Sequence, residues 1–221
     1  MRVGPTISAW FAALFLLAGG TTALHAHGTG EKDGPEFESL ALPQPVDVQG
    51  KIEVIEFFWY GCPHCATIEH GLEAWAARLP KDVVLRREHV LWDGRRGMAE
   101  HVRIFATLRA LDLLGTQHAA VFEAIHKGKL DLADEKKLFE WVSKRGVDRG
   151  KFDSTYRSFS VLSQVDRARQ LTKRYRVDGV PMFVVNGKYV TSIAMAHGPE
   201  RMFEVIEQLI AKERTLARRT P

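Results

Sequence analysis

The chain of 221 residues contains two cysteines, Cys62 and Cys65, which are separated only by Pro63 and His64. A C-x-x-C pair can form a redox-active disulfide, bind a metal ion or cross-link the chain. A disulfide that closes so short a loop removes little entropy from the unfolded chain, so its stabilising value is small. A zinc site of this kind needs a second pair of ligands at a suitable spacing, and none is evident. We therefore predict that the pair is redox-active and that the chain has no metal site.

The residues around the pair predict a strand that leads into a helix. Residues 53–59 are rich in β-branched and aromatic types, which is typical of a strand. Residues 63–79 have a helical pattern that ends at Pro80. This places Cys62 at the N-cap of the helix and Pro63 at its first position, where proline is favoured because its missing N–H is not needed.

This position predicts different acidities for the two thiols. The free N–H groups of His64 and Cys65 and the positive end of the helix dipole stabilise a thiolate on Cys62. A protonated His64 would add a further favourable charge. We predict that Cys62 is an acidic, exposed nucleophile and that Cys65, one turn into the helix, is the buried resolving cysteine. Because a stable Cys62 thiolate favours the reduced protein, the disulfide should be an oxidant.

Away from the pair, the pattern predicts an α/β domain that is split by an all-helical insertion. Asn186 and Gly187 form a strong two-residue hairpin turn between the last two strands, and Asp134 and Asp148 are reasonable helix caps. The expected strands are near 46–48 and at 53–59, 83–91, 182–185 and 188–191. The expected helices are at 63–79, 98–114, 117–127, 134–145, 149–157, 160–176 and 199–217.

The N-terminus has the layout of a secretory signal peptide. Arg2 is followed by an apolar stretch at 7–18, and small residues then lead to Ala23 and Ala26, either of which is a plausible cleavage point. The apolar stretch is too short to span a bilayer comfortably, although an uncleaved anchor is the alternative. Outside the cytosol a disulfide can persist. The expected organisation is a signal peptide at 1–26, a flexible lead-in at 27–45, the first part of the α/β domain at 46–97, the helical insertion at 98–176 and the second part at 177–221.

Two separated segments carry motifs of one known family. Segment 56–65 ends in Cys-Pro-His-Cys, whose Pro-His dipeptide differs from the Gly-Pro of thioredoxin and the Gly-His of protein disulfide isomerase. Segment 177–189 contains Gly-Val-Pro followed by the hairpin. Both resemble the DsbA family of periplasmic thiol:disulfide interchange proteins, in the same order along the chain. The resemblance implies a thioredoxin-like fold with an inserted all-helical domain. It also implies that the Val180-Pro181 bond is cis and lies beside the disulfide, where Val180 pairs with an extended substrate.

An acidic residue interrupts the apolar strand that precedes the cysteines. A strand covered on both faces makes the carboxylate of Glu56 costly unless it is paired or protonated. The resemblance implies that an acid at this place lies beneath the active site with a basic partner on the neighbouring strand. Arg87 is the candidate partner, and Glu69 is a second matching acid. We expect these three residues to tune proton movement and redox potential; the alternative is that Glu56 reaches solvent at a sheet edge.

The composition is that of a globular protein, with 45% hydrophobic and 26% charged residues and a net charge of +4. The basic clusters Arg86-Arg87, Arg95-Arg96 and 214–219 are interpreted as solvated faces. No nucleic-acid motif accompanies them, so we expect no nucleic-acid partner.

Nine histidines raise the question of a metal or catalytic role. His70, His101, His118 and His126 fall in helical stretches, where we expect surface or packing positions. His89 matches a strand histidine of the DsbA family, and its role stays open.

Together these observations predict a periplasmic thiol:disulfide oxidoreductase that donates its Cys62–Cys65 disulfide to exported folding proteins through a mixed disulfide. The resemblance implies reoxidation by a DsbB-like quinone-linked membrane oxidase, with no cofactor besides the disulfide, and we expect a monomer. One alternative is a disulfide isomerase or reductase, although residues 27–52 are too few for the dimerisation domain of such proteins. The other is a non-redox, chaperone-like binding module that uses the groove beside Pro181. The loop 192–197 is left unassigned.

Overall fold

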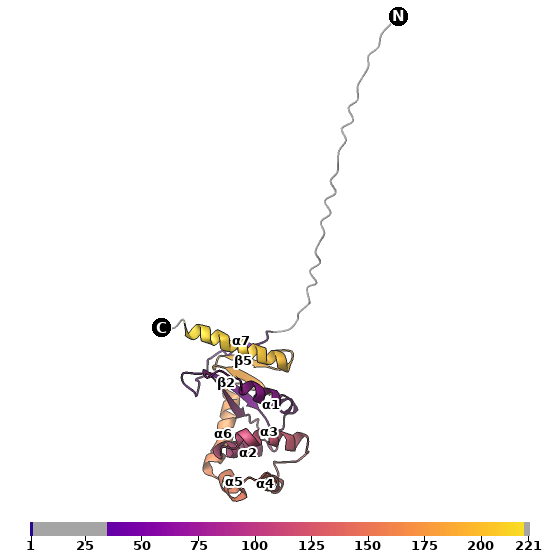
Figure 1. Cartoon of the computed structure of the whole chain (residues 1–221), viewed down its shortest axis with the longest axis vertical. Helices are drawn as coiled ribbons and strands as arrows, with labels where there is room; N and C mark the ends of the chain where they lie inside the picture. Colours follow the sequence, from indigo (N-terminus) through magenta and orange to yellow (C-terminus); the bar gives the residue numbers. More distant parts are fainter. Residues whose placement is uncertain (2–34, 219–221) are drawn as a thin grey trace. The chain divides into compact units, whose positions relative to one another are not determined.

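The computed structural model describes Met1 and residues 35–218, and Figure 1 shows how their strands and helices are arranged. The strands are β1 (Glu38–Ser39), β2 (Ile52–Phe58), β3 (Val83–His89), β4 (Met182–Val185) and β5 (Tyr189–Ser192). The helices are α1 (Pro63–Ala76), α2 (Met98–Ala110), α3 (Leu114–His126), α4 (Glu135–Lys144), α5 (Arg149–Tyr156), α6 (Phe159–Arg174) and α7 (Pro199–Ala217). Apart from Met1, the expected signal peptide lies outside the described residues.

The five strands form one mixed sheet in the order β1-β5-β4-β2-β3. β2 and β3 are parallel and are joined through α1, while the other neighbours are antiparallel. The register places Glu56 of β2 opposite Arg87 of β3 and opposite Phe183 of β4. β2 therefore lies between two other strands, and Glu56 does not reach solvent at a sheet edge.

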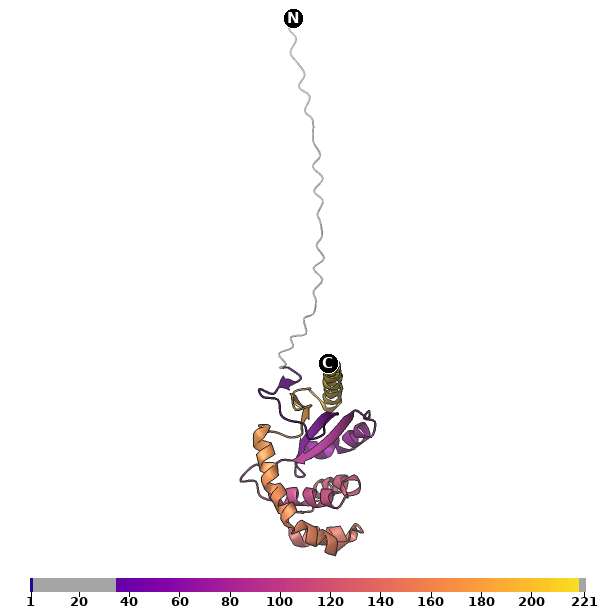
Figure 2. The ribbon, with the colours of Figure 1, turned by 90° about the vertical axis from the view of Figure 1, so that its left-hand side faces the viewer.

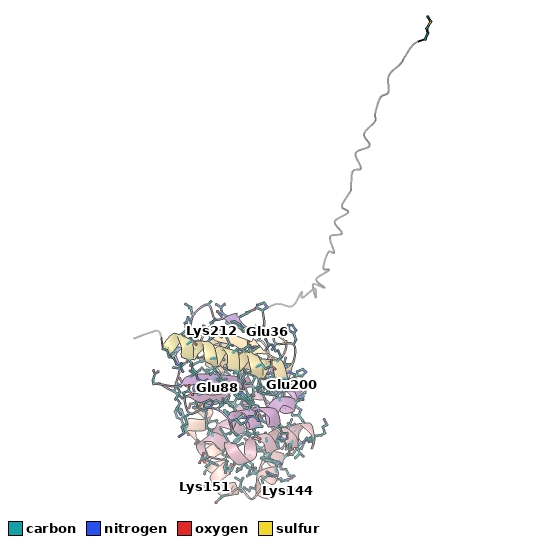
Figure 3. The ribbon with its side chains drawn as sticks, turned by 45° about the horizontal axis from the view of Figure 1, so that its top comes forward. Glu36, Glu88, Lys144, Lys151, Glu200 and Lys212 are labelled. Atoms are coloured by element: carbon teal, nitrogen blue, oxygen red, sulfur yellow. The ribbon has the colours of Figure 1, made fainter. Side chains whose placement is uncertain are left out.

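The helical insertion consists of α2 to α6, and no strand interrupts residues 98–176, all of which are described. The side chain of Asp134 caps α4 by accepting from two backbone N–H groups, and that of Asp148 caps α5. Figure 2 shows α6 running from the level of the sheet to α4 and α5 at the far end. Lys144 and Lys151 mark that end, opposite Lys212 of α7 (Figure 3). An α/β domain interrupted by an all-helical insertion is thus confirmed.

The first strand differs from the sequence-based expectation. Residues 46–48 form no strand; instead β1, in what was expected to be a flexible lead-in, pairs with β5. The backbone of Gln44 approaches the hairpin turn so closely that a Cβ on Gly187 would lie 2.1 Å from its carbonyl oxygen. Leu40 N–H also donates to the Lys188 carbonyl at 2.7 Å. Residues 38–44 are therefore anchored, a long-range pairing that no local pattern in this polar segment signals.

Three apolar clusters hold the sheet and helices together. One joins α1 and α7 to the sheet around Leu72 and Ile206. A second lies on the opposite side, where Phe57 packs with residues of α2 and α6. The third joins the active-site turn to α2 through α5 and contains Phe58, Tyr60 and both cysteines. The cysteines thus lie where the α/β domain meets the insertion. Among the described residues, no helix has the length and apolar character needed to cross a membrane.

Candidate active site

The C-x-x-C pair begins α1 as the sequence predicts. Cys62 is the N-cap, with extended backbone angles of φ −87° and ψ 119°, and Pro63 occupies the first turn. The Cys62 N–H donates to the Trp59 carbonyl at 2.9 Å, and its own carbonyl accepts from Ala66 N–H at 3.1 Å. These bonds fix the turn that brings the Cys62 sulfur to the end of the helix.

The two thiols have opposite acidities. A hydrogen bond from the Cys65 thiol, together with the backbone N–H groups of Cys65 and His64 and the charge of His64, lowers the pKa of Cys62 from 9.0 to about 6. Burial raises the pKa of Cys65 well above its ordinary value. Cys62 is 6% exposed and Cys65 is 0% exposed. The prediction of an exposed Cys62 is wrong in degree, because the turn and the neighbouring loop cover most of the residue, but Cys62 is the more accessible of the two.

The Val180-Pro181 loop lies directly beside the Cys62 sulfur. The peptide bond between Val180 and Pro181 is cis. The Cys62 thiol donates to the Val180 carbonyl at 3.4 Å. Next to this contact is an open groove of about 920 Å³, lined by His64, Val180 and Pro181 among others. Its lining also includes four residues of the loop that sequence reasoning left unassigned, which are Ser192, Ile193, Ala194 and Met195.

Glu56, Arg87 and Glu69 meet beneath the active-site turn. Arg87 donates from Nε to Glu56 Oε2 at 3.1 Å and from Nη2 to Glu69 Oε1 at 3.0 Å. Glu56 is 0% exposed and Glu69 is 2% exposed. Glu56 Oε1 and Glu69 Oε2 are buried without a hydrogen-bond partner. One guanidinium thus serves two buried carboxyl groups, whose second oxygens are left unpaired.

The pKa values of Glu56 and Glu69 shift in opposite directions. Burial raises the pKa of Glu56 to about 8, and Arg87 offsets this only in part. The pKa of Glu69 is lowered, because the opposing effects of His118 and Arg87 exceed that of burial. At neutral pH Glu56 therefore keeps its proton while Glu69 is ionised.

Four histidines hold the two residues that precede Gly61. The Tyr60 N–H donates to His89 Nε2 at 3.3 Å, and His126 Nε2 lies 2.8 Å from the Tyr60 carbonyl. The Tyr60 hydroxyl lies 2.7 Å from His118 Nδ1. The fourth contact is from Trp59 Nε1, which donates to His101 Nδ1 at 3.1 Å. His101 and His118 are buried, which agrees with the expected surface or packing positions, and in addition their ring nitrogens contact Trp59 and Tyr60.

A sequence signal for two of these histidines was present. His118, Phe122 and His126 follow one another at four-residue intervals, which places them on one face of α3. His70, by contrast, has a 69% exposed side chain, as expected for a surface position.

Trp59 makes Gly61 a close-packed position. A Cβ on Gly61 would lie 2.4 Å from the Trp59 indole ring. A side chain at position 61 would therefore force the Trp59 indole to move, so Gly61 allows the tryptophan to pack against the backbone before Cys62.

Two of the basic clusters differ in their surroundings. Arg95 and Arg96 are exposed, as expected. Arg86 and Arg87 are wrongly interpreted as a solvated face, since their side chains are only 16% and 19% exposed and pair with buried glutamates. Within the described part of the chain, no three His, Cys, Asp or Glu side chains are grouped so that they could hold a metal ion.

Comparison with known proteins gives consistent matches over most of the chain. The model of the DSBA-like thioredoxin domain matches residues 53–210. The thiol:disulfide interchange protein DsbA of Azotobacter vinelandii is 40% identical over 209 residues, which are 95% of this chain and 97% of that protein. DsbA of Bordetella pertussis is 41% identical over 88% of this chain and 92% of its own length. Among solved structures, Pseudomonas aeruginosa DsbA is 42% identical, with a TM-score of 0.79 over 84% of this chain and 96% of that one.

Proposed function

The chain belongs to the DSBA-like thioredoxin domain family and is a thiol:disulfide oxidoreductase, and from this premise we propose that the Cys62–Cys65 disulfide is the group it exchanges with substrates. Cys62 is the sulfur that the substrate attacks, and Cys65 is the resolving sulfur. The observation that carries the proposal is the unequal environment of the two sulfurs: the Cys62 pKa is lowered to about 6, while that of the fully buried Cys65 is raised. Pro63 starts the helix whose N–H groups face Cys62, and His64 adds a backbone donor and a favourable charge.

The exchange proceeds in two balanced steps. A substrate thiolate attacks Cys62 Sγ, the bond between Cys62 and Cys65 breaks, and the electron pair of that bond goes to Cys65 Sγ. A second substrate thiolate then attacks the substrate sulfur of the mixed disulfide, and Cys62 leaves as a thiolate. Two electrons pass to the protein, and the substrate gains a disulfide.

The low pKa of Cys62 sets the direction of transfer. At pH 7 a thiol of pKa about 6 is mostly ionised. Compared with an ordinary thiol, this stabilises the reduced protein by about 1.4 kcal/mol, or roughly 30 mV for a two-electron couple. The same acidity makes Cys62 a good leaving group in the second step. Both effects favour donation of the disulfide over reduction or isomerisation.

Glu56, Arg87 and Glu69 manage the proton that the first step requires. Cys65 is released as a thiolate in a site with 0% exposure, where an unpaired charge is costly. Glu56 holds a proton at neutral pH on the same buried side of the turn, and once it loses that proton its negative charge raises the pKa of the Cys65 thiol. Glu56 is therefore the proton source for Cys65, and Arg87 links it to Glu69.

The substrate lies as an extended segment in the groove beside Val180 and Pro181. The Val180 backbone faces Cys62, and Pro181 contributes no N–H donor that would compete for the substrate. The loop 192–197 forms the far wall of this groove through Ser192 to Met195.

The wider setting follows from the same family. The substrates are exported proteins with cysteine thiols, and the location is the periplasm, reached by the signal peptide at 1–26. A DsbB-like quinone-linked membrane oxidase restores the disulfide, and no further cofactor is required. The protein acts as a monomer with domain boundaries at 46–97, 98–176 and 177–221.

The proposal is tested by exchange with a reduced peptide that contains two cysteines. Oxidised protein should convert the peptide to its disulfide with one equivalent of Cys62–Cys65 dithiol formed. Cys62→Ala should abolish this, whereas Cys65→Ala, mixed with the oxidised form of the peptide, should form a mixed disulfide on Cys62, because the Cys62 thiolate displaces one sulfur of the peptide disulfide as a thiolate. Peptide oxidation by Cys62→Ala would support a binding module with another redox source, and a potential as reducing as that of thioredoxin would support a reductase.

A further inference from the structure

Glu69 lies next to nitrogen-bearing side chains from two different parts of the molecule. Arg87 of β3 reaches Glu69 Oε1 at 3.0 Å, and His118 of α3, in the helical insertion, has its Nε2 3.6 Å from Glu69 Oε2. The side chains of Glu69 and His118 are 2% and 1% exposed, and neither Glu69 Oε2 nor His118 Nε2 has a hydrogen-bond partner. Two unpartnered polar atoms thus face each other in a site closed to bulk water.

The tautomer of His118 follows from its other neighbour. Burial raises the pKa of Tyr60 well above its ordinary value, so its hydroxyl keeps its proton. His118 is itself neutral, since burial lowers its pKa. Glu69 Oε2 can only accept, so the tautomer that serves both neighbours carries its N–H on Nε2, and the Tyr60 O–H donates to His118 Nδ1 across 2.7 Å. That N–H points toward Glu69 Oε2.

The number of charges in the site shows why the His118 N–H affects which of the two glutamates is ionised. Arg87 supplies one positive charge to two buried carboxyl groups, Glu56 and Glu69, so one of the acids should hold a proton. Glu69 has a donor facing each of its oxygens. Glu56 has a donor on Oε2 alone, and its Oε1 is unpartnered. The arrangement favours ionised Glu69 and protonated Glu56.

We propose that His118 is a positioning residue for disulfide exchange: its Nε2–H, oriented by Tyr60, keeps Glu69 ionised and thereby assigns the one buried proton to Glu56, the acid that acts on Cys65. The inference deepens the proposed function and rests on it only for the final step to Cys65. It gives the helical insertion a part in the chemistry, because α3 supplies the residue that selects between two acids of the α/β domain.

The groups that face His118 come from several elements. α1 contributes Glu69 and Glu73, and β3 contributes Arg87. The surrounding rings are Phe58, Tyr60, Phe105 and Phe122. Glu69 has a buried oxygen without a hydrogen-bond partner 3.6 Å from the ring Nε2, so the effect of His118 should fall on Glu69 first.

The test is to follow the two carboxyl groups separately. The full chain, labelled with ¹³C at glutamate side-chain carboxyls, is titrated by NMR in the oxidised state, where the cysteines do not ionise. Glu56→Gln and Glu69→Gln assign the two signals. His118→Phe should raise the pKa of Glu69 by about one unit or more and lower that of Glu56, because the proton is then shared. His118→Gln, which keeps an N–H donor near the Nε2 position, should resemble the unmodified protein.

A matched control is available on the same helix. His126→Phe removes a histidine of α3 that also contacts Tyr60 but has no carboxyl partner in the buried pair, so both titrations should stay unchanged. Tyr60→Phe gives a second route if His118→Phe does not fold: without the hydroxyl the tautomer is no longer fixed, and the Glu69 titration should move in the same direction by less.

Two results would overturn the inference. One is a Glu69 titration that is unchanged in whichever of His118→Phe and Tyr60→Phe folds. The other is a His118→Gln variant that behaves like His118→Phe, since the ring charge and not the N–H would then be responsible. Failure of the proposed function is a different result: the unmodified protein would not oxidise a dithiol peptide, whatever the two carboxyl titrations show.

Discussion

Two glutamates of β2, Glu53 and Glu56, are both 0% exposed, yet their surroundings differ. They are three residues apart on a strand and therefore lie on opposite faces of the sheet. Glu53 has both carboxylate oxygens paired: Arg86 donates to Oε2 at 3.0 Å and to Oε1 at 3.2 Å, and Asp47 N–H adds a bond to Oε2. Glu56 has a single donor, Arg87, and one unpartnered oxygen.

The network around Glu53 extends to further partners. Arg86 also pairs with Glu88, two residues along β3, and Glu88 Oε1 accepts from Arg167 of α6 at 3.2 Å. Arg109 of α2 lies 3.7 Å from Glu88 Oε2. Figure 3 shows Glu88 on the face between α7 and the helices of the insertion. Each carboxylate of this network has more than one cationic or N–H partner.

The comparison shows that two buried glutamates of one strand can have different roles, one structural and one chemical. A fully paired buried carboxylate ties its partners together, so Glu53 and Glu88 hold β2 and β3 to α2 and α6. A buried acid with too few donors keeps a proton that can be given up. The difference between the two glutamates is therefore one of donor number, since burial is equal.

The sharpest way to break the comparison is to remove each arginine. Arg86→Met leaves Glu53 as a buried carboxylate with only a backbone donor and should cost about 3–5 kcal/mol of unfolding free energy. Arg87→Met should cost less, about 1–3 kcal/mol, because Glu56 is already protonated and Glu69 keeps His118. Urea unfolding at pH 7 measures both. Equal losses would show that the two networks are equivalent.

The two substitutions should rank in the opposite order when their effect on activity is measured. Arg87→Met should change the pH dependence of peptide oxidation, while Arg86→Met, measured where it is still folded, should leave that dependence in place.

The next test replaces the acids themselves. Glu53→Gln loses charge-assisted bonds and should lower stability by about 1.5–3 kcal/mol at pH 7. The effect of Glu56→Gln on stability should depend on pH. The folded pKa of Glu56, about 8, exceeds its ordinary 4.5, so its contribution to stability is fully present below pH 4.5 and is lost as pH rises through 8.

The stabilities of Glu56→Gln and the unmodified protein should therefore differ most in alkaline solution. Glu56→Gln should match the unmodified protein near pH 5 and exceed its stability near pH 9, as followed by thermal unfolding across that range. A Glu56→Gln variant that is equally destabilised at both pH values would contradict a protonated Glu56.

The contrast between the glutamates also marks how far the sequence can predict the site. Glu56 stood out because it interrupts an apolar run, and Arg87 was the candidate partner because the family resemblance implies a basic residue on the neighbouring strand. Glu53 lies at the beginning of the same run, where an acid is unremarkable in sequence, so its complete burial was not foreseen. Glu88, another partner of Arg86, also pairs with Arg167 of α6, 79 residues away along the chain.

The same limit applies to the histidines. Local helical pattern places His118 on α3, but its contact with Glu69 arises from the packing of the insertion against α1, which the chain pattern does not encode. The cysteines, the cap and the hairpin turn were predictable because each depends on neighbours in sequence, whereas the cis bond at Pro181 and its place beside the cysteines were expected from the family resemblance. β1 was not, because it depends on a strand 150 residues later.

A smaller effect is expected from the active-site thiol. The pKa of Cys62, lowered from 9.0 to about 6, means that its contribution is present above pH 9 and is lost as pH falls through 6. Reduced protein should therefore gain stability over oxidised protein as pH rises, with about 1.4 kcal/mol of this gained by pH 7. Paired unfolding curves of the two redox states test this, and Glu53→Gln should leave the gap between them unchanged. A gap that is constant from pH 5 to 9 would exclude a low-pKa Cys62.

The smallest effect on stability is expected at Asp47, the exposed acid that contacts the arginines around Glu53 and Glu88. Asp47 has a 54% exposed side chain and lies 3.4 Å from Arg86 and 3.2 Å from Arg167. Because water screens it and both arginines keep buried partners, Asp47→Asn should change stability by no more than about 0.5 kcal/mol and should not alter exchange. Its backbone N–H, which bonds to Glu53, is unaffected by the substitution. A loss of stability comparable to that of Arg86→Met would mean that the network depends on the exposed Asp47 side chain. The distinction between a fully paired Glu53 and an underpaired Glu56 would then no longer hold.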